Sequence, residues 1–247
     1  MRFFSIILLL FIIPLTVVSQ SKITVEDIYT GQFRSTGMDE LQAMKNTNQY
    51  TILNTNRGAK SQQIDLYDYA TLKKVSTLIN TADFNLLADG IDSYTFSANE
   101  KMILIAANSN QIYRHSFTAD YYVYTIATKQ LTKILDQAQE VTFSPDGTKV
   151  AYAKANNLFI YDLATAAVVQ ITSDGKKNAI INGITDWVYE EEFSYVRAFD
   201  WSADSKKIAF IKFDETLVPE FSMNIYKKSL YPNVETFKYP KAGEKNA

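Results

Sequence analysis

One pattern occurs three times in this sequence of 247 residues, at 94–106, 141–153 and 199–211. Each copy has an aromatic residue, a serine, a turn signal and a lysine, followed by an apolar run that ends near an alanine. The serines of successive copies are 47 and 58 residues apart. A repeat of about 40–50 residues with turn signals is typical of the blades of a β-propeller. The repeat therefore predicts an all-β fold built from antiparallel blades.

The middle copy shows how one blade is expected to form. Ser144-Pro-Asp-Gly147 reads as a turn, because proline presets φ at its second position and glycine closes it. Strands are predicted at 149–154, 158–163 and 168–171, with a further turn at 155–157. Four short strands in a meander make one blade, and a blade needs neighbours to bury its faces.

The rest of the chain extends the same arrangement. Residues 49–78 are interpreted as an earlier blade, in which 63–68 forms a strand. Residues 20–48 are a lead-in segment, of which 23–46 has mixed, partly helical character. Residues 49–247 are then an incomplete β-propeller of about four blades, the last unfinished. The repeat leaves two alternatives open, a small closed propeller or the front of a longer one.

Residues 1–19 read as a signal peptide rather than as part of the fold. Arg2 supplies a positive charge, an apolar run covers 3–18, and Val17-Val18-Ser19 precedes a cleavage site before Gln20. The alternative is a membrane anchor, but the run is shorter than the roughly 20 residues that span a bilayer. We therefore expect an exported bacterial protein, periplasmic or secreted, with no membrane attachment after cleavage.

Composition excludes several kinds of chemistry. The chain has no cysteine, which excludes thiolate metal sites, disulfides and a cysteine nucleophile. It has a single histidine, His115. The formal net charge of −2 argues against a general nucleic-acid binder. None of the eight glycines has the spacing of a Gly-x-Ser-x-Gly nucleophile elbow, a P-loop or a dinucleotide fingerprint. We predict no cofactor, no metal site and no catalytic residue in these 247 residues.

The strongest local feature is the run of glutamates from 190 to 192, with aromatic residues at 187, 189 and 193. In a strand only Glu190 and Glu192 would share a face, whereas on a turn or short helix adjacent carboxylates can converge. Converging carboxylates suit a primary ammonium, which brings a positive charge and three N–H donors. The alternative is a solvated acidic loop.

A second candidate is Tyr113-Arg114-His115-Ser116. The planar guanidinium of Arg114 can clamp a carbonyl or carboxylate, although a purely structural arginine is the alternative. His115 is interpreted as a packed or hydrogen-bonded residue rather than a general base. A serine that follows it in the sequence does not make a catalytic triad.

Four segments together resemble the dipeptidyl peptidase IV family of serine peptidases, in its bacterial branch. The segment from Asn182 to Glu192 looks like the family's double-glutamate motif, and 113–119 resembles its arginine segment. Two further signatures of the family are similar to segments of this sequence, the first to Phe213-Asp-Glu215 with Val218-Pro219 and the second to 239–243. Order and spacing match from about residue 23 to 247.

The resemblance implies a fold and an activity. Family members have an eight-bladed N-terminal propeller and a C-terminal α/β-hydrolase domain, and they release X-Pro or X-Ala dipeptides from polypeptide N-termini. The second and third glutamates, Glu191 and Glu192 here, hold the substrate α-ammonium. Arg114 is expected to contact a substrate carbonyl and to help position the glutamates. Peptide or protein N-termini are thus the expected partners, and family members often dimerise, largely through parts absent from this sequence.

The sequence departs from the family in one respect. The serine, aspartate and histidine of the triad belong to the hydrolase domain, which is absent here. We therefore interpret the chain as an N-terminal propeller fragment of a secreted or periplasmic exopeptidase, inactive by itself. The alternative is a non-catalytic propeller that binds peptides or proteins.

Overall fold

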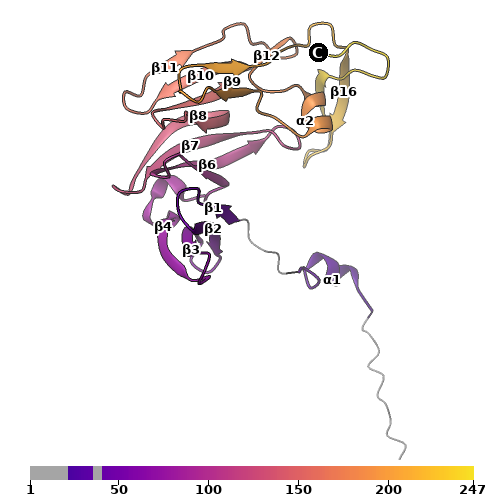
Figure 1. Cartoon of the computed structure of the whole chain (residues 1–247). Helices are drawn as coiled ribbons and strands as arrows, with labels where there is room; N and C mark the ends of the chain where they lie inside the picture. Colours follow the sequence, from indigo (N-terminus) through magenta and orange to yellow (C-terminus); the bar gives the residue numbers. More distant parts are fainter. Residues whose placement is uncertain (1–21, 36–40) are drawn as a thin grey trace, which may run out of the picture. The chain divides into compact units, whose positions relative to one another are not determined.

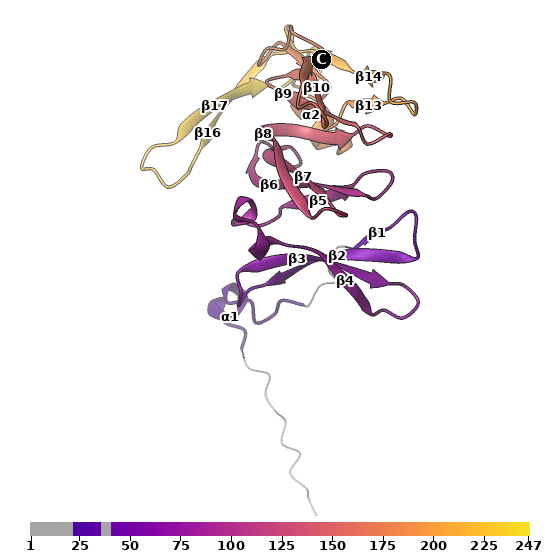
Figure 2. The same cartoon turned by 90° about the vertical axis from the view of Figure 1, so that its left-hand side faces the viewer.

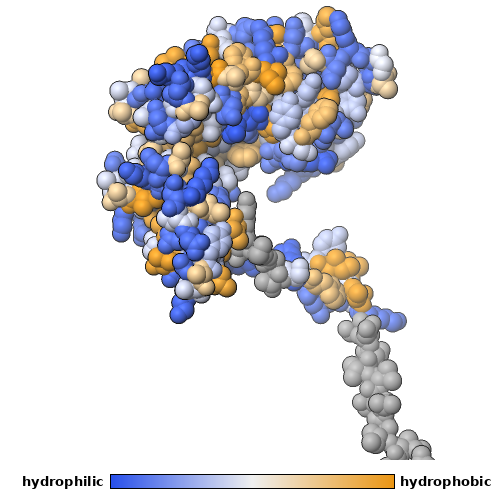
Figure 3. Space-filling view, viewed as in Figure 1, coloured by the Kyte–Doolittle hydropathy of each residue, from blue (hydrophilic) through white to orange (hydrophobic). Residues whose placement is uncertain are grey.

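The structure is a computed structural model that describes residues 22–35 and 41–247. The predicted signal peptide, residues 1–19, lies outside the described residues. The chain divides into two compact units, Met1–Met38 and Asp39–Ala247. The first unit contains α1 (Val25–Tyr29), which begins with a capping box: Thr24 accepts from the Asp27 amide, and Asp27 accepts from the Thr24 amide. Its apolar side chains Val25, Ile28 and Tyr29 are exposed (Figure 3).

The second unit begins with a four-stranded antiparallel sheet in the order β1-β2-β3-β4. The strands are β1 (Leu41–Ala43), β2 (Gln49–Asn56), β3 (Ser61–Asp68) and β4 (Lys74–Asn80). β1 comes from the segment predicted as a lead-in and pairs with β2, so this sheet begins before residue 49. Two single-turn 3-10 helices, η1 (Thr81–Asp83) and η2 (Asn85–Leu87), lead to the next sheet.

The next sheet has seven antiparallel strands in sequence order. They are β5 (Ser93–Phe96), β6 (Met102–Gln111), β7 (Phe117–Thr125), β8 (Gln130–Phe143), β9 (Lys149–Lys154), β10 (Asn157–Asp162) and β11 (Val168–Gln170). The 14-residue β8 pairs with β7 through its first part and with β9 through its last. It therefore belongs to two successive blades, and the register shifts where it passes from one to the other.

Both faces of the central strands are buried. Ile103 and Ile105 of β6 pack with Ile64 and Ile79 of the first sheet, in one apolar cluster. Leu104, between them, belongs to a second cluster on the opposite face, with Val150 and Tyr152 of β9. Because successive side chains of a strand point to opposite faces, this alternation places β6 in the middle of a stack of sheets.

The last part of the unit forms three two-stranded sheets and one helix. The paired strands are β12 (Ile180–Asn182) with β15 (Lys212–Asp214), β13 (Phe199–Trp201) with β14 (Ile208–Phe210), and β16 (Glu220–Ile225) with β17 (Asn233–Lys238). The helix is α2 (Trp187–Phe193). The β13–β14 hairpin and α2 lie in the sequence between the paired strands β12 and β15, and the β16–β17 hairpin follows (Figures 1 and 2). The predicted all-β, incomplete propeller is confirmed, and the sheets of the described residues do not close into a ring.

The three sequence repeats form one recurring turn. In each copy the serine hydroxyl donates a hydrogen bond to the side-chain oxygen of the residue two positions on. It also accepts a hydrogen bond from the backbone amide five positions on, and the serines are Ser97, Ser144 and Ser202. The fourth residue of each turn has positive φ: 56° at Glu100, 71° at Gly147 and 61° at Ser205. The sequence signal therefore corresponds to a hydrogen-bonded hairpin turn that starts the same strand in each blade.

No helix among residues 22–35 and 41–247 has the length and apolar character needed to cross a membrane.

We predict that Ser144→Ala destabilises the protein more than Ser202→Ala does. The two serines make matching bonds, but Ser144 is 1% exposed whereas Ser202 is only partly buried. Water can replace the lost bonds at Ser202 but not at Ser144, where the Lys149 amide loses its side-chain acceptor. We expect about 1–3 kcal/mol for Ser144→Ala and about 0.5–1 kcal/mol for Ser202→Ala. Urea unfolding followed by far-ultraviolet circular dichroism measures both, and equal losses would contradict the role of burial.

Candidate functional site

Helix α2 forms because the chain supplies a cap at each end. Asp186 at the N-cap accepts the Tyr189 amide at 2.9 Å through its side chain. Ser194 ends the helix in the left-handed conformation, and its amide donates to the Glu190 carbonyl at 3.0 Å. The glutamate run therefore lies on a helix, as adjacent converging carboxylates require.

Aromatic contacts hold α2 against the neighbouring strands. The Tyr189 ring lies 4.9 Å from that of Phe213 in β15, in an edge-on arrangement. The Trp187 ring lies 6.0 Å from Phe237 of β17 and 4.9 Å from Tyr239. Aromatic pairs stabilise a fold by more than the burial of their apolar area alone, so the helix is held in place from two sides.

The first part of the arginine segment, 113–116, lies in the loop 112–116 between β6 and β7, and the rest begins β7. Hydrogen bonds within the loop define its shape. The Ile112 amide donates to the Ser116 carbonyl at 2.9 Å, and the Tyr113 amide to the Ser116 hydroxyl at 3.2 Å. The side-chain amide of Gln111 donates to the carbonyls of Tyr113 and Arg114. We call residues 112–116 the arginine loop.

The arginine loop and α2 meet at an ion pair. Arg114 Nε lies 3.0 Å from Glu191 Oε2, and the Glu191 side chain is only 13% exposed whereas that of Arg114 is 74% exposed. Glu192 is exposed, and the described part of the chain gives its carboxylate no hydrogen bond or ion pair. The structure thus brings Arg114 and Glu191 into contact, and Glu192 follows Glu191 on the helix.

The first glutamate has a different environment. Glu190 is 2% exposed, and its Oε1 accepts the amides of His115 at 2.8 Å and Ser116 at 2.7 Å. Sequence reasoning treated Glu190 only as one member of an acidic run. Its spacing of three residues from Trp187 indicates that the two share a face of the helix, but no local signal points to the amides of His115 and Ser116.

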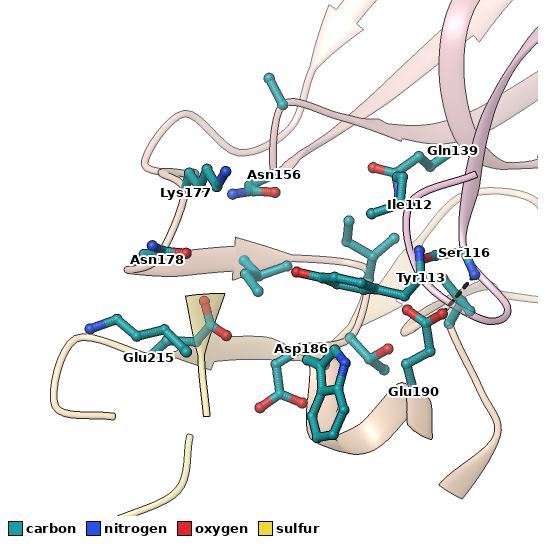
Figure 4. A pocket seen from close by; sticks show the side chains of 18 of the residues that line it. Ile112, Tyr113, Ser116, Gln139, Asn156, Lys177, Asn178, Asp186, Glu190 and Glu215 are labelled. Carbon is teal, nitrogen blue, oxygen red and sulfur yellow. Dashed lines mark hydrogen bonds between the residues drawn. The ribbon is translucent and has the colours of Figure 1, made fainter. Parts of the chain in front are cut away.

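A cavity of about 520 Å³ lies beside α2 and the arginine loop. Tyr113, Asp186, Glu190 and Glu215 line it, and so does Lys177, which Figure 4 shows on the same side as Glu215. Glu215 is 6% exposed, and its carboxylate has no hydrogen bond or ion pair within the described residues. Phe213-Asp-Glu215 was noted in the sequence as a signature, but without a role.

Burial and like charge shift the pKa values of the acids in this cavity. Desolvation, and after it the charge of Asp186, raises the pKa of Glu215 to about 7. Desolvation also raises the pKa of Asp186, although the hydrogen bond from the Tyr189 amide acts to lower it. The pKa of Tyr113 is raised to about 12 by desolvation and by the surrounding carboxylates.

The side chains of residues 22–35 and 41–247 form no group of three or more metal-ligating residues that could hold a metal ion. His115 is exposed. The site is therefore described by its carboxylates and its guanidinium.

Residues 97–247 match the protein family described as Dipeptidyl peptidase IV (DPP IV) N-terminal region. The chain belongs to the dipeptidyl peptidase IV family. It is 37% identical over 177 residues to dipeptidyl peptidase 4 of Felis catus, covering 69% of this chain and 23% of the relative. It is 32% identical over 187 residues to prolyl endopeptidase FAP of Homo sapiens, covering 74% and 24%.

The fold agrees with that assignment to the dipeptidyl peptidase IV family. The crystal structure of Porphyromonas gingivalis dipeptidyl peptidase 4 superposes with a TM-score of 0.83 at 36% identity, covering 92% of this chain and 32% of that one. The chain therefore spans about a quarter to a third of the length of these relatives. The family resemblance drawn from the glutamate and arginine segments is confirmed.

We predict that Glu215→Gln stabilises the protein at pH 8 but not at pH 5. The folded pKa of Glu215, about 7, exceeds the ordinary 4.5, so its contribution to stability is complete below pH 4.5 and is lost as pH rises through 7. Glutamine at this position cannot ionise, so the variant does not lose this stability as pH rises. Melting temperature measured against pH tests this.

Asp214→Asn is the control for that pH series. Asp214 is exposed, and hydrogen bonds from Thr216 lower its pKa, so its contribution is present above the ordinary value of 3.8 and is lost only in acid. Between pH 5 and 8 this variant should shift the melting temperature by a constant amount. A constant shift for Glu215→Gln as well would contradict the raised pKa.

Proposed function

We propose that this chain supplies the substrate-recognition part of a serine exopeptidase that releases X-Pro or X-Ala dipeptides from polypeptide N-termini. Glu191 and Glu192 bind the substrate α-ammonium, and Arg114 binds a backbone carbonyl of the substrate. The observation that carries the proposal is the 3.0 Å contact between Arg114 and Glu191, because it joins the two predicted substrate-binding segments in one site. Membership of the dipeptidyl peptidase IV family supports the reaction class.

The environment of the glutamates suits a cation with several donors. An α-ammonium has three N–H groups and is largely charged at neutral pH, with an ordinary pKa of about 8. Charge-assisted hydrogen bonds to carboxylates are short and strong, and Glu191 is already shielded from water. The exposed Glu192 has no partner among the described residues, so its carboxylate is available to a ligand.

The same arrangement accounts for exopeptidase specificity. An internal peptide segment brings no ammonium to the site and would leave the carboxylates facing an uncharged backbone. Specificity then comes from the penalty on the wrong substrate as well as from attraction to the right one. Fixing the ammonium also fixes which peptide bond reaches the nucleophile, two residues along.

The proposal extends to the whole enzyme. The nucleophile and its triad partners belong to a hydrolase domain outside these residues, and the 247 residues alone are expected to hydrolyse no peptide. Residues 1–19 are expected to direct export and then to be removed, and the complete enzyme can form homodimers. Non-catalytic binding of peptide N-termini is the alternative, and activity measurements on the complete gene product separate the two.

We predict that Glu191→Ala and Glu192→Ala each lower kcat/KM by at least about 100-fold in the complete enzyme, on a Gly-Pro chromogenic substrate. Each change removes a carboxylate that holds the ammonium. The wild-type enzyme should also fail to cleave the same substrate when its N-terminus is acetylated.

Asp136→Asn is the matched control, because Asp136 is an exposed acid of β8 whose partner is Lys133, away from α2. Its kcat/KM should equal that of the wild type. Near-normal turnover by the Glu191 and Glu192 variants would refute their assignment. A complete enzyme with no dipeptidyl peptidase activity would favour the binding-module alternative.

A further inference from the structure

Glu190 joins two segments that are far apart in the sequence. It lies on α2, and its Oε1 accepts the amides of His115 and Ser116, which precede it by 75 and 74 residues. Figure 4 shows its side chain extending from the helix to the loop that carries Tyr113 and Ser116. At 2% exposure, the carboxylate is enclosed by the two segments that it connects.

The other hydrogen bonds of the arginine loop do not make this connection. Those from Ile112, Tyr113 and the Gln111 side chain all end within the loop itself. They define the shape of the loop, but they do not link it to α2. Within the described part of the chain, the two bonds to Glu190 are the hydrogen bonds that link the loop backbone to the helix.

The Arg114–Glu191 ion pair cannot replace those bonds. The Arg114 side chain is 74% exposed, and an ion pair with an exposed partner contributes little because water and salt screen it. Hydrogen bonds from buried amides to a carboxylate are stronger, and a buried carboxylate without them would be costly. The position of Arg114 is therefore set by its neighbours His115 and Ser116, which Glu190 holds.

We propose that Glu190 is a positioning residue for substrate binding, which holds the backbone next to Arg114 so that the guanidinium stays opposite Glu191. It does this without touching the substrate. The inference rests on the proposed function, since it assigns a role in the same site.

Geometry also separates this role from direct binding of the ammonium. Glu190 Oε1 already accepts two amides, and the side chain is almost entirely enclosed. Glu191 and Glu192 are the members of the run with solvent access. A positioning role depends on the acceptor oxygen and on side-chain length, whereas binding of the ammonium would depend on charge.

Three variants of the complete enzyme distinguish these requirements on the Gly-Pro substrate. Glu190→Gln keeps an acceptor oxygen at the same reach, so we expect kcat/KM within about threefold of the wild type. Glu190→Asp keeps the charge but is one methylene too short to meet both amides. Glu190→Ala removes the acceptor. For the last two we expect kcat/KM to fall by about 10–100-fold, mainly through KM, since misplacing a binding group by about 1 Å can cost that much.

A second measurement tests whether Glu190 acts through Arg114. In an Arg114→Ala background there is no guanidinium left to position. Glu190→Ala should then lower kcat/KM by less than about threefold further, because residues that act through one another are not additive. A role that only stabilises the fold would leave the two effects additive.

Asp65→Asn is the matched control for loss of a buried carboxylate. Asp65 is buried in the first sheet, where it accepts from Asn54, Thr77 and Lys74, and it has no contact with α2. It should lower the melting temperature without changing KM. The same behaviour from Glu190→Ala would overturn the proposal.

Other outcomes are equally decisive. Loss of activity in Glu190→Gln with retention in Glu190→Asp would show that charge matters, which overturns positioning in favour of direct binding. An active wild type in which Glu191→Ala is inactive but Glu190→Ala is normal would overturn this inference alone. A wild type without dipeptidyl peptidase activity would overturn both this inference and the proposed function. The Gln and Asp variants keep the test decisive where the alanine variant does not fold.

Discussion

Burial of strands on both faces is the constraint on which the rest of this structure depends. Ile103 and Ile105 point to one apolar cluster and Leu104 to another, so β6 is stable only with a neighbouring blade on each face. The arginine loop connects β6 to β7, another strand buried on both faces. A loop on such strands has fixed ends, which is what a binding residue needs if it is to be held in place before the ligand arrives.

The glutamate run shows how one short helix can place three identical side chains in three environments. Glu190 is enclosed and bonded to backbone amides, Glu191 is shielded and paired with Arg114, and Glu192 is exposed. The helical rotation of about 100° per residue separates them, since 3.6 residues make one turn. A cation site needs carboxylates that are rigid and yet accessible, and here Glu190 can supply the rigidity while Glu191 stays partly accessible and Glu192 fully so.

Much of the fold could be predicted from the repeat, because its turn chemistry is local. The strand expected at 149–154 is β9, and those expected at 158–163 and 168–171 agree with β10 and β11 within one residue. The division of labour among the glutamates could not be predicted, because it depends on contacts with residues about 75 positions away. For the same reason the buried position of Glu215 was missed: residues far apart in the chain, among them Asp186 and Tyr113, make its environment.

The shared strand β8 has a consequence for how this unit opens. The same 14 residues close one blade against β7 and open the next against β9. Neither blade can separate from the other without breaking β8, so the seven strands form one cooperative unit in the sense used for native-state hydrogen exchange. Amides of β7 and β9 should therefore share one opening free energy, whereas the β16–β17 hairpin, a separate two-stranded sheet, can open alone. The strands that carry the arginine loop, β6 and β7, thus belong to this cooperative unit.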